Sequence, residues 1–577
     1  MILASPETIA AFTQKGYWGR ESLLDLIEAH AAAHPDAEAL VDPDNRQALA
    51  GGLPGRFTWA RMLAAIDRLA AGFQRLGLGR EDVILVQLPN IAEIVLTYFA
   101  AARIGAISSP LSMMARTHEL TTAVAITGAR AIVSLPRFHG FDHEQMIQAL
   151  QVRFPRLEHR IMVGEPSLEG SVRADDWLAP TAPAADLKKA AVSPNDVFTI
   201  CWTSGTEAEP KGVPHTHNEW IAISRVVVEG CQMTPGFNIH GSFPVINMAG
   251  FGGTLVPWVL TGGKFVLHHP FDQGVFFAQL ARERIDYTLM PPALLETLAK
   301  SPSVESLDAL AVKVIGSGSV PLSPWMVRFY QERFNIGIVN FFASNEGIAF
   351  FSAPRFFPDP EDRARYFPRF GRTEVRWNVP EQVVGGMRSR LVRPGTTEEI
   401  VDNGEVGELC FAGPTVFAGY WNRPELSQKA FDPQGYYHTG DLFSIEGPHQ
   451  DKYLFRGRYK DLIIRGGQNI SPEEVETLVI GHPKIQEVAA VGCPDERLCE
   501  RTCVVVVPVA GETVTLEEIV AFMAAKGVAR YKLPERIEIV ESLPRNAVQK
   551  VLRREIREWL WRKVAAEQAP DASPSCA

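Results

Sequence analysis

The sequence predicts an α/β fold, with a large N-terminal domain of layered α/β subdomains plus a β subdomain, and a small α+β C-terminal domain. Helical and strand patterns alternate through the N-terminal part, which favours layers with largely parallel strands. The chain has 577 residues, more than the roughly 250–300 at which a single core stops growing. Its composition is 46% hydrophobic, with 31 Phe and 11 Trp, which suits a large interior.

The N-terminal elements follow from the spacing of apolar residues. Residues 58–76 repeat them at helical spacing, and residues 82–89 form an apolar run that stops at a proline, as a buried strand does. Residues 91–103 predict a second helix, and residues 105–110 predict a second strand. The same reasoning predicts later strands at residues 131–134, 160–163, 197–202, 287–290 and 311–315.

The pattern changes towards the C-terminus. Between residues 356 and 435, Gly, Pro and charged residues increase around short strands such as 407–412, which predicts a smaller, mainly β subdomain. Further elements are predicted as a helix at 472–480 and strands at 487–491 and 503–509. We therefore expect domains at residues 1–459 and 460–564. Residues 565–577 have the small, polar composition of a disordered tail.

Charge and hydropathy exclude several classes of protein. A net charge of −10 argues against a nucleic-acid binder or a binder of anionic membranes. Residues 230–263 contain no Asp, Glu, Lys or Arg, a length that could cross a bilayer. Repeated Pro and Gly would leave backbone groups unpaired in lipid, so we expect buried strands and loops there instead. No secretory signal begins the chain, and the predicted location is cytoplasmic.

The seven cysteines are scattered along the chain. None of them forms a Cys-x-x-Cys pair, and no His follows at the spacing of zinc ligands. An odd, sparse set of this kind is typical of free thiols in a reducing compartment. The sequence therefore predicts no structural zinc site.

A polar loop with a lysine follows the predicted strand at 197–202. The loop begins Thr203, Ser204, Gly205, Thr206. Lys211 comes five residues later. Hydroxyl groups and a glycine let the backbone approach a phosphate, and the lysine supplies the positive charge that a polyphosphate needs. A Walker A loop is excluded, since its lysine opens a helix after glycine. A polar surface hairpin is the alternative interpretation.

The segment 199–213 resembles the phosphate-binding loop of the adenylate-forming superfamily, which contains acyl- and aryl-CoA synthetases, peptide-synthetase adenylation domains and firefly-type luciferases. That family has Gly where this chain has Ala208. The resemblance extends over roughly residues 20–560, with further segments in family order. It implies that the loop binds the phosphates of ATP and that Lys211 takes part in catalysis.

Two segments resemble the family's adenine and metal sites. Residues 316–322 resemble the adenine-binding turn, which implies that Ser319, Val320 and Pro321 lie against the base. Residues 340–346 resemble the family's Tyr-Gly-x-Thr-Glu segment. An ordinary strand-to-helix turn remains the alternative for the first of these segments.

The resemblance assigns roles within the second of these segments. Glu346 stands where the family has its magnesium-binding carboxylate, and a hard cation prefers such an oxygen ligand. Phe342 replaces Tyr and can stack on adenine. Asn345 replaces Thr and can donate a hydrogen bond to the α-phosphate. Ala343 replaces Gly.

The closest family matches are residues 404–414, 419–425 and 437–441. Asp441 is the implied ribose ligand, because a carboxylate accepts hydrogen bonds from both vicinal hydroxyls. Arg458 would also reach the ribose. Lys460 stands at the family's hinge, which implies a mobile C-terminal domain.

The C-terminal segments resemble the parts of the family that meet CoA and the acid. Residues 465–476 resemble the loop that approaches CoA, where Gly466 and Gly467 would let the backbone pass close to the pantetheine arm. Residues 544–550 resemble the catalytic-lysine motif, with Gln549 in place of Gly. Lys550 would hold the carboxylate and offset charge that develops between the acid and the α-phosphate.

The acid pocket is expected beside the adenine and metal segments. Its expected residues are Asn247, Met248, Gly253, Ser317, Gly318 and Ala343. Asn247 replaces the histidine of the family's gate, and a purely structural Asn is the alternative. No charged residue occurs at 243–254, which predicts an uncharged, mostly apolar acid. This gate and residues 17–18 resemble the aryl-acid ligase branch, which includes cyclohexanecarboxylate-type ligases.

The resemblance implies an ATP- and Mg2+-dependent carboxylic acid–CoA ligase for an aromatic, alicyclic or medium-chain acid. A stand-alone enzyme that adenylates an acid and loads a carrier protein is the second interpretation. An inactive nucleotide-binding protein is the third, suggested by Ala208, Asn345 and Gln549. Retained Lys550, Asp441 and Glu346 favour an active enzyme. A homodimer is left open.

Overall fold

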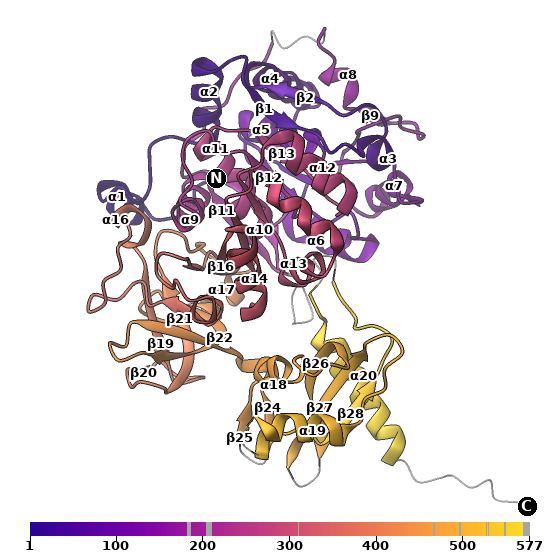
Figure 1. Ribbon diagram of the computed structural model, residues 1–577. Coiled ribbons are helices and arrows are strands. Elements are labelled where there is room, and N and C mark those ends of the chain that lie inside the picture. Colours follow the sequence, from indigo (N-terminus) through magenta and orange to yellow (C-terminus); the bar gives the residue numbers. More distant parts are fainter. Residues whose placement is uncertain are drawn as a thin grey trace, which may run out of the picture. The chain divides into compact units, whose positions relative to one another are not determined.

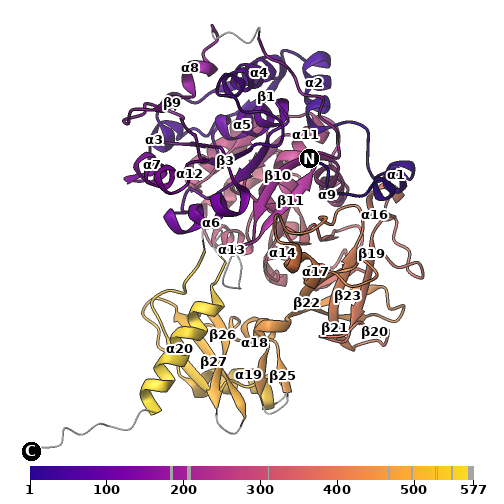
Figure 2. The same cartoon turned by 180° about the vertical axis from the view of Figure 1, so that it is seen from behind.

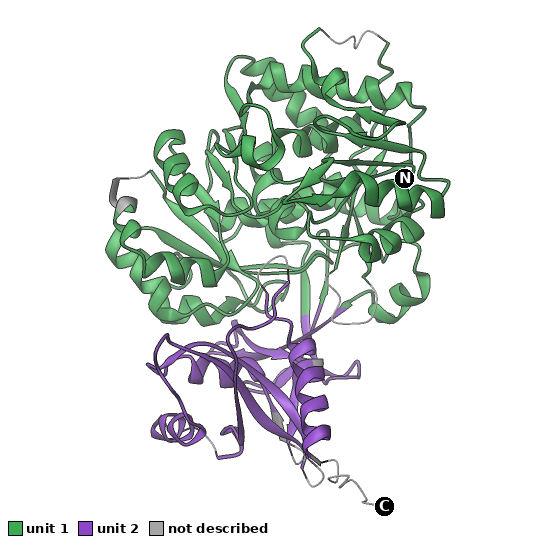
Figure 3. Ribbon diagram, turned by 90° about the vertical axis from the view of Figure 1, so that its right-hand side faces the viewer, with its two compact units in different colours: residues 1–389, 411–437 green, residues 390–410, 438–577 purple. Residues whose placement is uncertain are grey.

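The structure is a computed structural model that describes residues 1–181, 186–203, 210–309, 311–465, 468–495, 498–526, 528, 530–546 and 550–568. The chain divides into two compact units (Figure 3). Unit 1 comprises Met1–Ser389 and Phe411–Tyr437, and unit 2 comprises Arg390–Cys410 and His438–Ala577. The division runs through three strands, whereas the sequence placed the domain boundary at 459/460. The predicted α/β class is confirmed by the sheets described below.

Unit 1 contains a sheet in the order β11-β10-β4-β3-β5-β8-β9, in which β3, β9, β10 and β11 are labelled in Figure 2. The neighbours pair in parallel, except for the antiparallel pair β10–β11. Its strands are β3 (Val83–Gln87), β4 (Ile107–Pro110), β5 (Ala131–Ser134), β8 (His159–Met162), β9 (Ser171–Arg173), β10 (Val197–Trp202) and β11 (Gly212–Thr216). The apolar run at 82–89 is thus a buried strand, as predicted.

A second sheet of unit 1 has the order β17-β16-β15-β14-β12-β13-β1-β2, and it is parallel except at its two ends. Its strands are β1 (Glu38–Val41), β2 (Arg56–Thr58), β12 (Ile239–Gly241), β13 (Phe265–Leu267), β14 (Tyr287–Leu289), β15 (Val314–Gly318), β16 (Gly337–Ala343) and β17 (Ala349–Ser352). Shorter strands are β6 (Arg137–Phe138), β7 (Phe141–Asp142) and β18 (Tyr366–Pro368).

The helices of unit 1 cover these sheets, with α12 beside β12 and β13 in Figure 1. They are α1 (Pro6–Gln14), α2 (Leu23–Ala33), α3 (Arg46–Ala50), α4 (Trp59–Arg75), α5 (Ala92–Arg103), α6 (Thr117–Thr127), α7 (His143–Arg153), α8 (Asp175–Leu178), α9 (His217–Gly230), α10 (Met248–Gly250), η1 (Phe251–Leu255), α11 (Val256–Thr261), α12 (Gln273–Glu283), α13 (Pro292–Ala299), η2 (Pro302–Ala309), α14 (Pro324–Phe334), α15 (Pro360–Arg365), α16 (Glu381–Val384) and α17 (Pro424–Ala430). Every residue of α5 is buried, as expected of a helix that is apolar on all sides.

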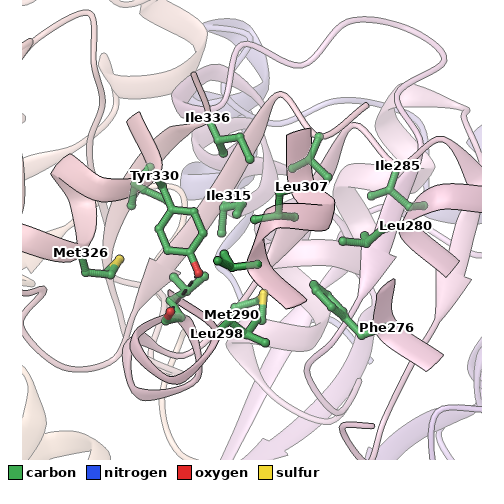
Figure 4. Close-up of a cluster of buried hydrophobic side chains, with 14 of the residues drawn as sticks. Phe276, Leu280, Ile285, Met290, Leu298, Leu307, Ile315, Met326, Tyr330 and Ile336 are labelled. Atoms are coloured by element: carbon green, nitrogen blue, oxygen red, sulfur yellow. Dashed lines mark hydrogen bonds between the residues drawn. The ribbon is translucent and has the colours of Figure 1, made fainter. Parts of the chain in front are cut away.

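Figure 4 shows a core cluster beneath α12 to α14, in which Met290, Ile315 and Tyr330 meet. Tyr330 belongs to α14, and its hydroxyl donates a hydrogen bond to the carbonyl oxygen of Leu295 at 2.9 Å. The cluster fixes β14 and β15. Strand β15 ends with the predicted acid-pocket residues Ser317 and Gly318, and the predicted adenine-contacting residues 319–321 follow it directly.

The charge-free segment at 230–263 differs from the prediction. Residues 248–261 form the continuous helical stretch α10, η1 and α11, not strands and loops. Glycines allow the close packing of this helix: a Cβ at Gly250 would lie 2.3 Å from the carbonyl oxygen of Pro244. Pro257 is the second residue of α11, directly after the π-helical turn η1 has interrupted the regular α-helical hydrogen bonding. In the part of the chain that the structure describes, no helix combines the length and apolar composition needed to cross a membrane.

Unit 2 contains strands in the order β23-β22-β21-β19-β20 and a sheet β25-β24-β27-β26, in which β28 also pairs with β27. The strands are β19 (Arg388–Val392), β20 (Glu399–Ile400), β21 (Val406–Ala412), β22 (Tyr437–Glu446), β23 (Lys452–Arg458), β24 (Ile463–Arg465), β25 (Gln468–Ile470), β26 (Ile485–Asp495), β27 (Cys499–Pro508) and β28 (Arg536–Ile539). The helices are η3 (Tyr459–Asp461), α18 (Pro472–Val479), α19 (Leu516–Ala525), η4 (Arg530–Lys532) and α20 (Arg553–Gln568). Helix α20 continues into the segment that the sequence assigned to a disordered tail.

Candidate active site

The β10–β11 hairpin carries the predicted phosphate loop. Its two sides are joined where the strands end: the Thr203 N–H donates to the Lys211 carbonyl oxygen at 3.0 Å. The Lys211 N–H donates to Thr203 Oγ1 at 3.3 Å. The predicted phosphate ligands Ser204, Gly205 and Thr206 lie outside the described residues. The described residues therefore fix the base of the loop and Lys211.

Lys211 and Glu346 lie on either side of a tyrosine that the sequence did not single out. Lys211 Nζ lies 5.0 Å from the centroid of the Tyr420 ring. The Tyr420 hydroxyl donates to Glu346 Oε1 at 3.1 Å and lies 3.4 Å from the Tyr437 hydroxyl. Burial, followed by the charge of Glu346, raises the pKa of Tyr437 well above 10. Both tyrosines are buried, and they fix one carboxylate oxygen beside a cation.

The turn that carries Glu346 is held against the chain segment around residue 415. The Phe417 N–H donates to the Glu346 carbonyl oxygen at 3.1 Å. Gly347 follows with a φ of +98°, and a Cβ there would lie 1.9 Å from the Thr415 carbonyl oxygen. Only glycine permits this approach. Half-buried Glu346 interacts with the hydroxyls of Tyr420 and Tyr437, and one carboxylate with substrate phosphates is a typical Mg2+ ligand set. The residues present therefore fit a magnesium ion at Glu346.

Asn345 links three elements of unit 1. Its Oδ1 accepts from the Met248 N–H at 2.9 Å, and its Nδ2 donates to the Trp202 carbonyl oxygen at 2.9 Å. Its own carbonyl oxygen accepts from His215 Nε2 at 2.6 Å. The predicted hydrogen bond to an α-phosphate would use the second amide hydrogen and stays a prediction. The linking role was not predicted, because these partners lie 97 to 143 residues away.

The gate residue Asn247 caps the helix that follows it. Its Oδ1 accepts from the N–H groups of Ala249 and Gly250 at 3.1 and 3.2 Å, which satisfies two otherwise unpaired donors at the start of α10. Asn247 therefore has the structural role that the sequence offered as the alternative to a gate. The capped turn leads into the π-helical turn η1, and such turns are frequent at functional sites.

The predicted acid-pocket residues lie at the start of α10, in η1 and at the ends of β15 and β16. Met248 is buried, and a Cβ at Gly253 would lie 2.5 Å from the Leu289 side chain. Ser317 is buried, and its Oγ donates to the Met290 carbonyl oxygen at 2.8 Å. A Cβ at Gly318 would lie 2.2 Å from the Phe341 carbonyl oxygen. Ala343, at the end of β16, is exposed.

The predicted adenine turn is exposed and unusual in its backbone. Ser319 has a φ of +73°, a region that non-glycine residues rarely adopt and that clusters at functional sites. Val320 is 43% exposed, and Pro321 is exposed as well. Phe342 lies on the neighbouring strand β16, with its ring 6.0 Å from that of Phe367. A strained turn with an apolar exposed side chain suits contact with a flat base.

Unit 2 brings together three predicted site residues. Asp441 on β22 faces Arg458 on β23 in the sheet register, and Arg458 Nε donates to Asp441 Oδ1 at 2.9 Å. Lys550 lies close enough to both residues for their charges to act on its amine. Lys550 and Asn546 form two hydrogen bonds with each other, each of 2.9 Å. Burial and then the charge of Arg458 lower the pKa of Lys550 to about 8, while Asp441 acts in the opposite direction.

The predicted hinge and CoA loop are described only in part. Lys460 lies in the short helix η3, two residues after Arg458. Gly466 and Gly467 lie outside the described residues, between β24 and β25. Their roles remain predictions.

Comparison with known proteins identifies the family. The AMP-binding enzyme model matches residues 27–421, and the model of the AMP-binding enzyme C-terminal domain matches residues 474–550. The medium-chain fatty-acid–CoA ligase of Escherichia coli K12 is 31% identical, with 97% of this chain and 94% of the relative covered. The 2,3-dihydroxybenzoate-AMP ligase of Bacillus subtilis is 27% identical, with 97% and 98% covered.

The fold is also that of solved adenylate-forming enzymes. The anthranilate CoA ligase AuaEII, solved in complex with anthranoyl-AMP, has a TM-score of 0.80 at 21% identity and covers 95% of this chain, with 98% of its own chain matched. The predicted family and fold are therefore confirmed, and the chain belongs to the AMP-binding enzymes, a family of adenylate-forming ligases.

Proposed function

We propose that this adenylate-forming ligase is an ATP-dependent carboxylic acid–CoA ligase. In the first step a carboxylate oxygen attacks the α-phosphorus of ATP, and pyrophosphate leaves. In the second step the CoA thiolate attacks the acyl carbon, and AMP leaves as the thioester forms. The observation that carries the proposal is the group of Asp441, Arg458 and Lys550 in unit 2.

Each member of this group has a chemical task in the first step. Asp441 is a buried carboxylate with an oxygen held by Arg458, and a carboxylate is the type of group that can accept from both ribose hydroxyls. Lys550 supplies a cation where charge develops between the acid and the α-phosphate, and a fixed cation in a partly dry site stabilises such charge strongly. A lysine with a pKa of about 8 is still mostly protonated at neutral pH.

Residues of unit 1 would bind the phosphates. Lys211 is held over the Tyr420 ring and adds a positive charge beside Glu346. Glu346 would hold Mg2+, which when bound neutralises phosphate charge. The protein mainly positions and neutralises groups in such a reaction, because phosphoryl chemistry needs little covalent help.

The acid is expected to have an uncharged, mostly apolar body. The gate segment 243–254 has no charged residue, and Asn247 uses its side-chain oxygen to cap α10. An amine on the substrate would therefore meet no carboxylate from this segment. An aromatic, alicyclic or medium-chain monocarboxylate fits, and the name of the Escherichia coli relative supports the last of these.

The thiol acceptor separates two candidate functions. CoA is favoured by the relative named as a CoA ligase and by the glycine pair at 466–467. A carrier protein is favoured by the relative named as an AMP ligase, since that name mentions no CoA. The predicted cytoplasmic location is compatible with either acceptor.

The two functions are separated by AMP release. The purified chain is incubated with MgATP and panels of aromatic, alicyclic and straight-chain acids, with and without CoA. CoA-stimulated AMP release with one acid class is the expected result. Acid-dependent ATP–pyrophosphate exchange that CoA does not stimulate would replace the proposal with the carrier-loading function. No exchange with any acid would contradict both.

A further inference from the structure

Three side chains that can bind a metal ion meet in unit 2, on strands β21 and β22. Glu408 and Cys410 are two residues apart on β21, so both side chains lie on the same face of that strand. His438 stands on β22, which neighbours β21 in the sheet. Sequence spacing did not suggest the group, because 28 residues separate the cysteine from the histidine.

The donor atoms are spaced as metal ligands are. His438 Nδ1 lies 3.0 Å from Glu408 Oε2 and 3.5 Å from Cys410 Sγ, and the three candidate ligand atoms lie within 4.8 Å of one another. Zinc bonds of about 2.0–2.1 Å to nitrogen, 2.3 Å to sulfur and 2.0–2.2 Å to oxygen, at tetrahedral angles, separate neighbouring ligands by roughly 3.3–3.6 Å. His438 Nδ1 therefore already lies within about half an ångström of such a separation from each of the other two donor atoms, while the Glu408–Cys410 pair lies within 4.8 Å.

The chemistry of the donors selects the type of ion. Glu408 and Cys410 are buried and His438 is half-buried, so the group is partly screened from water. A sulfur, an imidazole nitrogen and a carboxylate oxygen together suit zinc, whereas Mg2+ prefers oxygen ligands alone. A His438–Glu408 hydrogen bond explains the proximity of those two residues without an ion. It does not explain why a thiol lies at the same imidazole nitrogen.

We propose that Glu408, Cys410 and His438 form a binding site for Zn2+ or another thiophilic divalent cation, with water in the fourth position. Binding forms a bond from the cation to Cys410 Sγ, and the thiol proton is released to solvent. His438 binds through Nδ1, and any proton on that nitrogen is also released. Metal affinity therefore falls as the pH falls, because protons compete for both ligands.

The site is linked to the proposed nucleotide ligand. Glu408 Oε1 accepts a hydrogen bond from the Gly440 N–H at 2.9 Å, and Gly440 directly precedes Asp441. A cation that draws Glu408 towards itself also acts on this turn. Resting on the proposed function, we infer that a bound cation changes the affinity for nucleotide at Asp441.

Cobalt(II) is the direct probe of the site, because its absorption reports both geometry and sulfur ligation. Chelator-treated full-length protein is titrated with CoCl2 and then with ZnCl2. One equivalent of Co2+ should give tetrahedral d–d bands and a thiolate charge-transfer band, and one equivalent of Zn2+ should remove both. Absence of these bands with no measurable Zn2+ binding would overturn the proposal.

Variants locate the binding. Cys410→Ser should abolish the thiolate band, and Glu408→Gln and His438→Gln should weaken Zn2+ binding more than about tenfold, as loss of a ligand does. Glu408→Gln retains an acceptor for the Gly440 N–H, so weaker binding in this variant would not be explained by the loss of that hydrogen bond. The matched control is Cys231→Ala, a buried free thiol of unit 1, which should leave the bands unchanged. Bands that persist in Cys410→Ser would contradict the assignment.

Nucleotide binding tests the link. AMP binding is measured by calorimetry with and without one equivalent of Zn2+. Affinity should change severalfold in the native protein and stay constant in Cys410→Ser. Equal affinities in the native protein would overturn the link but not the metal site. Because the cobalt bands need no turnover, failure of the metal site is distinguishable from failure of the proposed ligase activity.

Discussion

At the scale of a single residue, the surroundings of Lys550 set its protonation state. It is half-buried, and it lies near a second cation, Arg458, as well as near Asp441. Both burial and Arg458 disfavour its charged form, which is why its pKa falls to about 8 from the ordinary value near 10.5. A group so placed is tuned to hold a proton at neutral pH and to lose it in mild alkali.

The pH dependence of adenylation should report this lysine. If the protonated amine is required, kcat/KM for acid-dependent ATP–pyrophosphate exchange falls about tenfold per pH unit above pH 8, because this parameter reports the free enzyme. Lys550→Arg keeps its charge to far higher pH, so the alkaline fall should move out of range, however low the rate. A fall at the same pH in Lys550→Arg would assign it to another group.

Single residues also show what sequence reasoning could and could not supply. Lys550, Asp441 and Arg458 were predicted from motifs, and the structure brings them together in one unit. Tyr420 lies inside a matched segment but received no role. Its function depends on where its ring stands relative to Lys211 and Glu346, residues that are distant in the chain.

At the scale of secondary-structure elements, Asn345 connects several parts of unit 1. Two backbone groups, on β10 and at the start of α10, bond to its side chain, and the His215 side chain on β11 bonds to its carbonyl oxygen. The helical stretch that follows was wrongly expected to be strands and loops, because its many glycines and prolines read as turns. Those glycines instead allow close helix packing, which composition alone does not reveal.

Removing the Asn345 side chain should weaken these connections. Asn345→Ala leaves the Met248 N–H and the Trp202 carbonyl oxygen without this partner, which should cost about 1–3 kcal/mol in the free energy of unfolding. The exposed Asn403→Ala serves as control and should change stability by less than about 0.5 kcal/mol. Urea unfolding gives both values. Equal stabilities of the two variants would argue against a structural role for the amide.

The turn at Gly347 offers a second test at this scale. Gly347→Ala forces a Cβ into the Thr415 carbonyl oxygen, whereas Gly435→Ala shares a positive φ but meets nothing within 4 Å. Gly435→Ala should cost about 1–2 kcal/mol from backbone strain alone. Gly347→Ala should cost about 1–3 kcal/mol more and should raise the Mg2+ concentration needed for ATP–pyrophosphate exchange. Similar losses in both variants would show that strain, not the close contact, matters.

At the scale of the whole molecule, buried histidines set the acid limit of stability. Burial lowers the pKa to about 4 for four histidines and to about 3 for His268. The four are His143, His217, His240 and His269. Between pH 6.5 and about 4 the unfolded chain therefore binds protons that the folded chain does not, and stability falls with pH. Buried Asp42, with its pKa raised to about 6, and Glu476, whose pKa burial also raises, act in the opposite direction but are two groups against five.

Thermal unfolding of the full chain between about pH 7.5 and 4.5 tests this account. Tm should fall steadily below pH 6.5, and His240→Gln should flatten the fall, since one such group contributes up to about 1.4 kcal/mol per pH unit. A Tm that stays constant down to pH 5 would show that these histidines are protonated in the fold without cost.

Family and fold class are the properties that the sequence predicted most fully, since they rest on many motifs in order over nearly the whole chain. The boundary was harder, because unit 2 takes Arg390–Cys410 from a distant part of the chain. The metal-ligand group on β21 and β22 was missed for the same reason: strand pairing, not spacing, brings Cys410 to His438. Long-range pairing is the information that local patterns lack.

Acid-dependent ATP–pyrophosphate exchange tests the central claim, that this chain adenylates a carboxylic acid with the help of Lys550. Native protein, Lys550→Ala and the control Lys532→Ala, whose amine pairs with Glu474 elsewhere in unit 2, are compared with the best acid of the panel. Native protein and control should exchange at equal rates, and Lys550→Ala should lose about 10²–10³-fold. Exchange at the native rate in Lys550→Ala, or exchange that does not depend on an acid, would contradict the account.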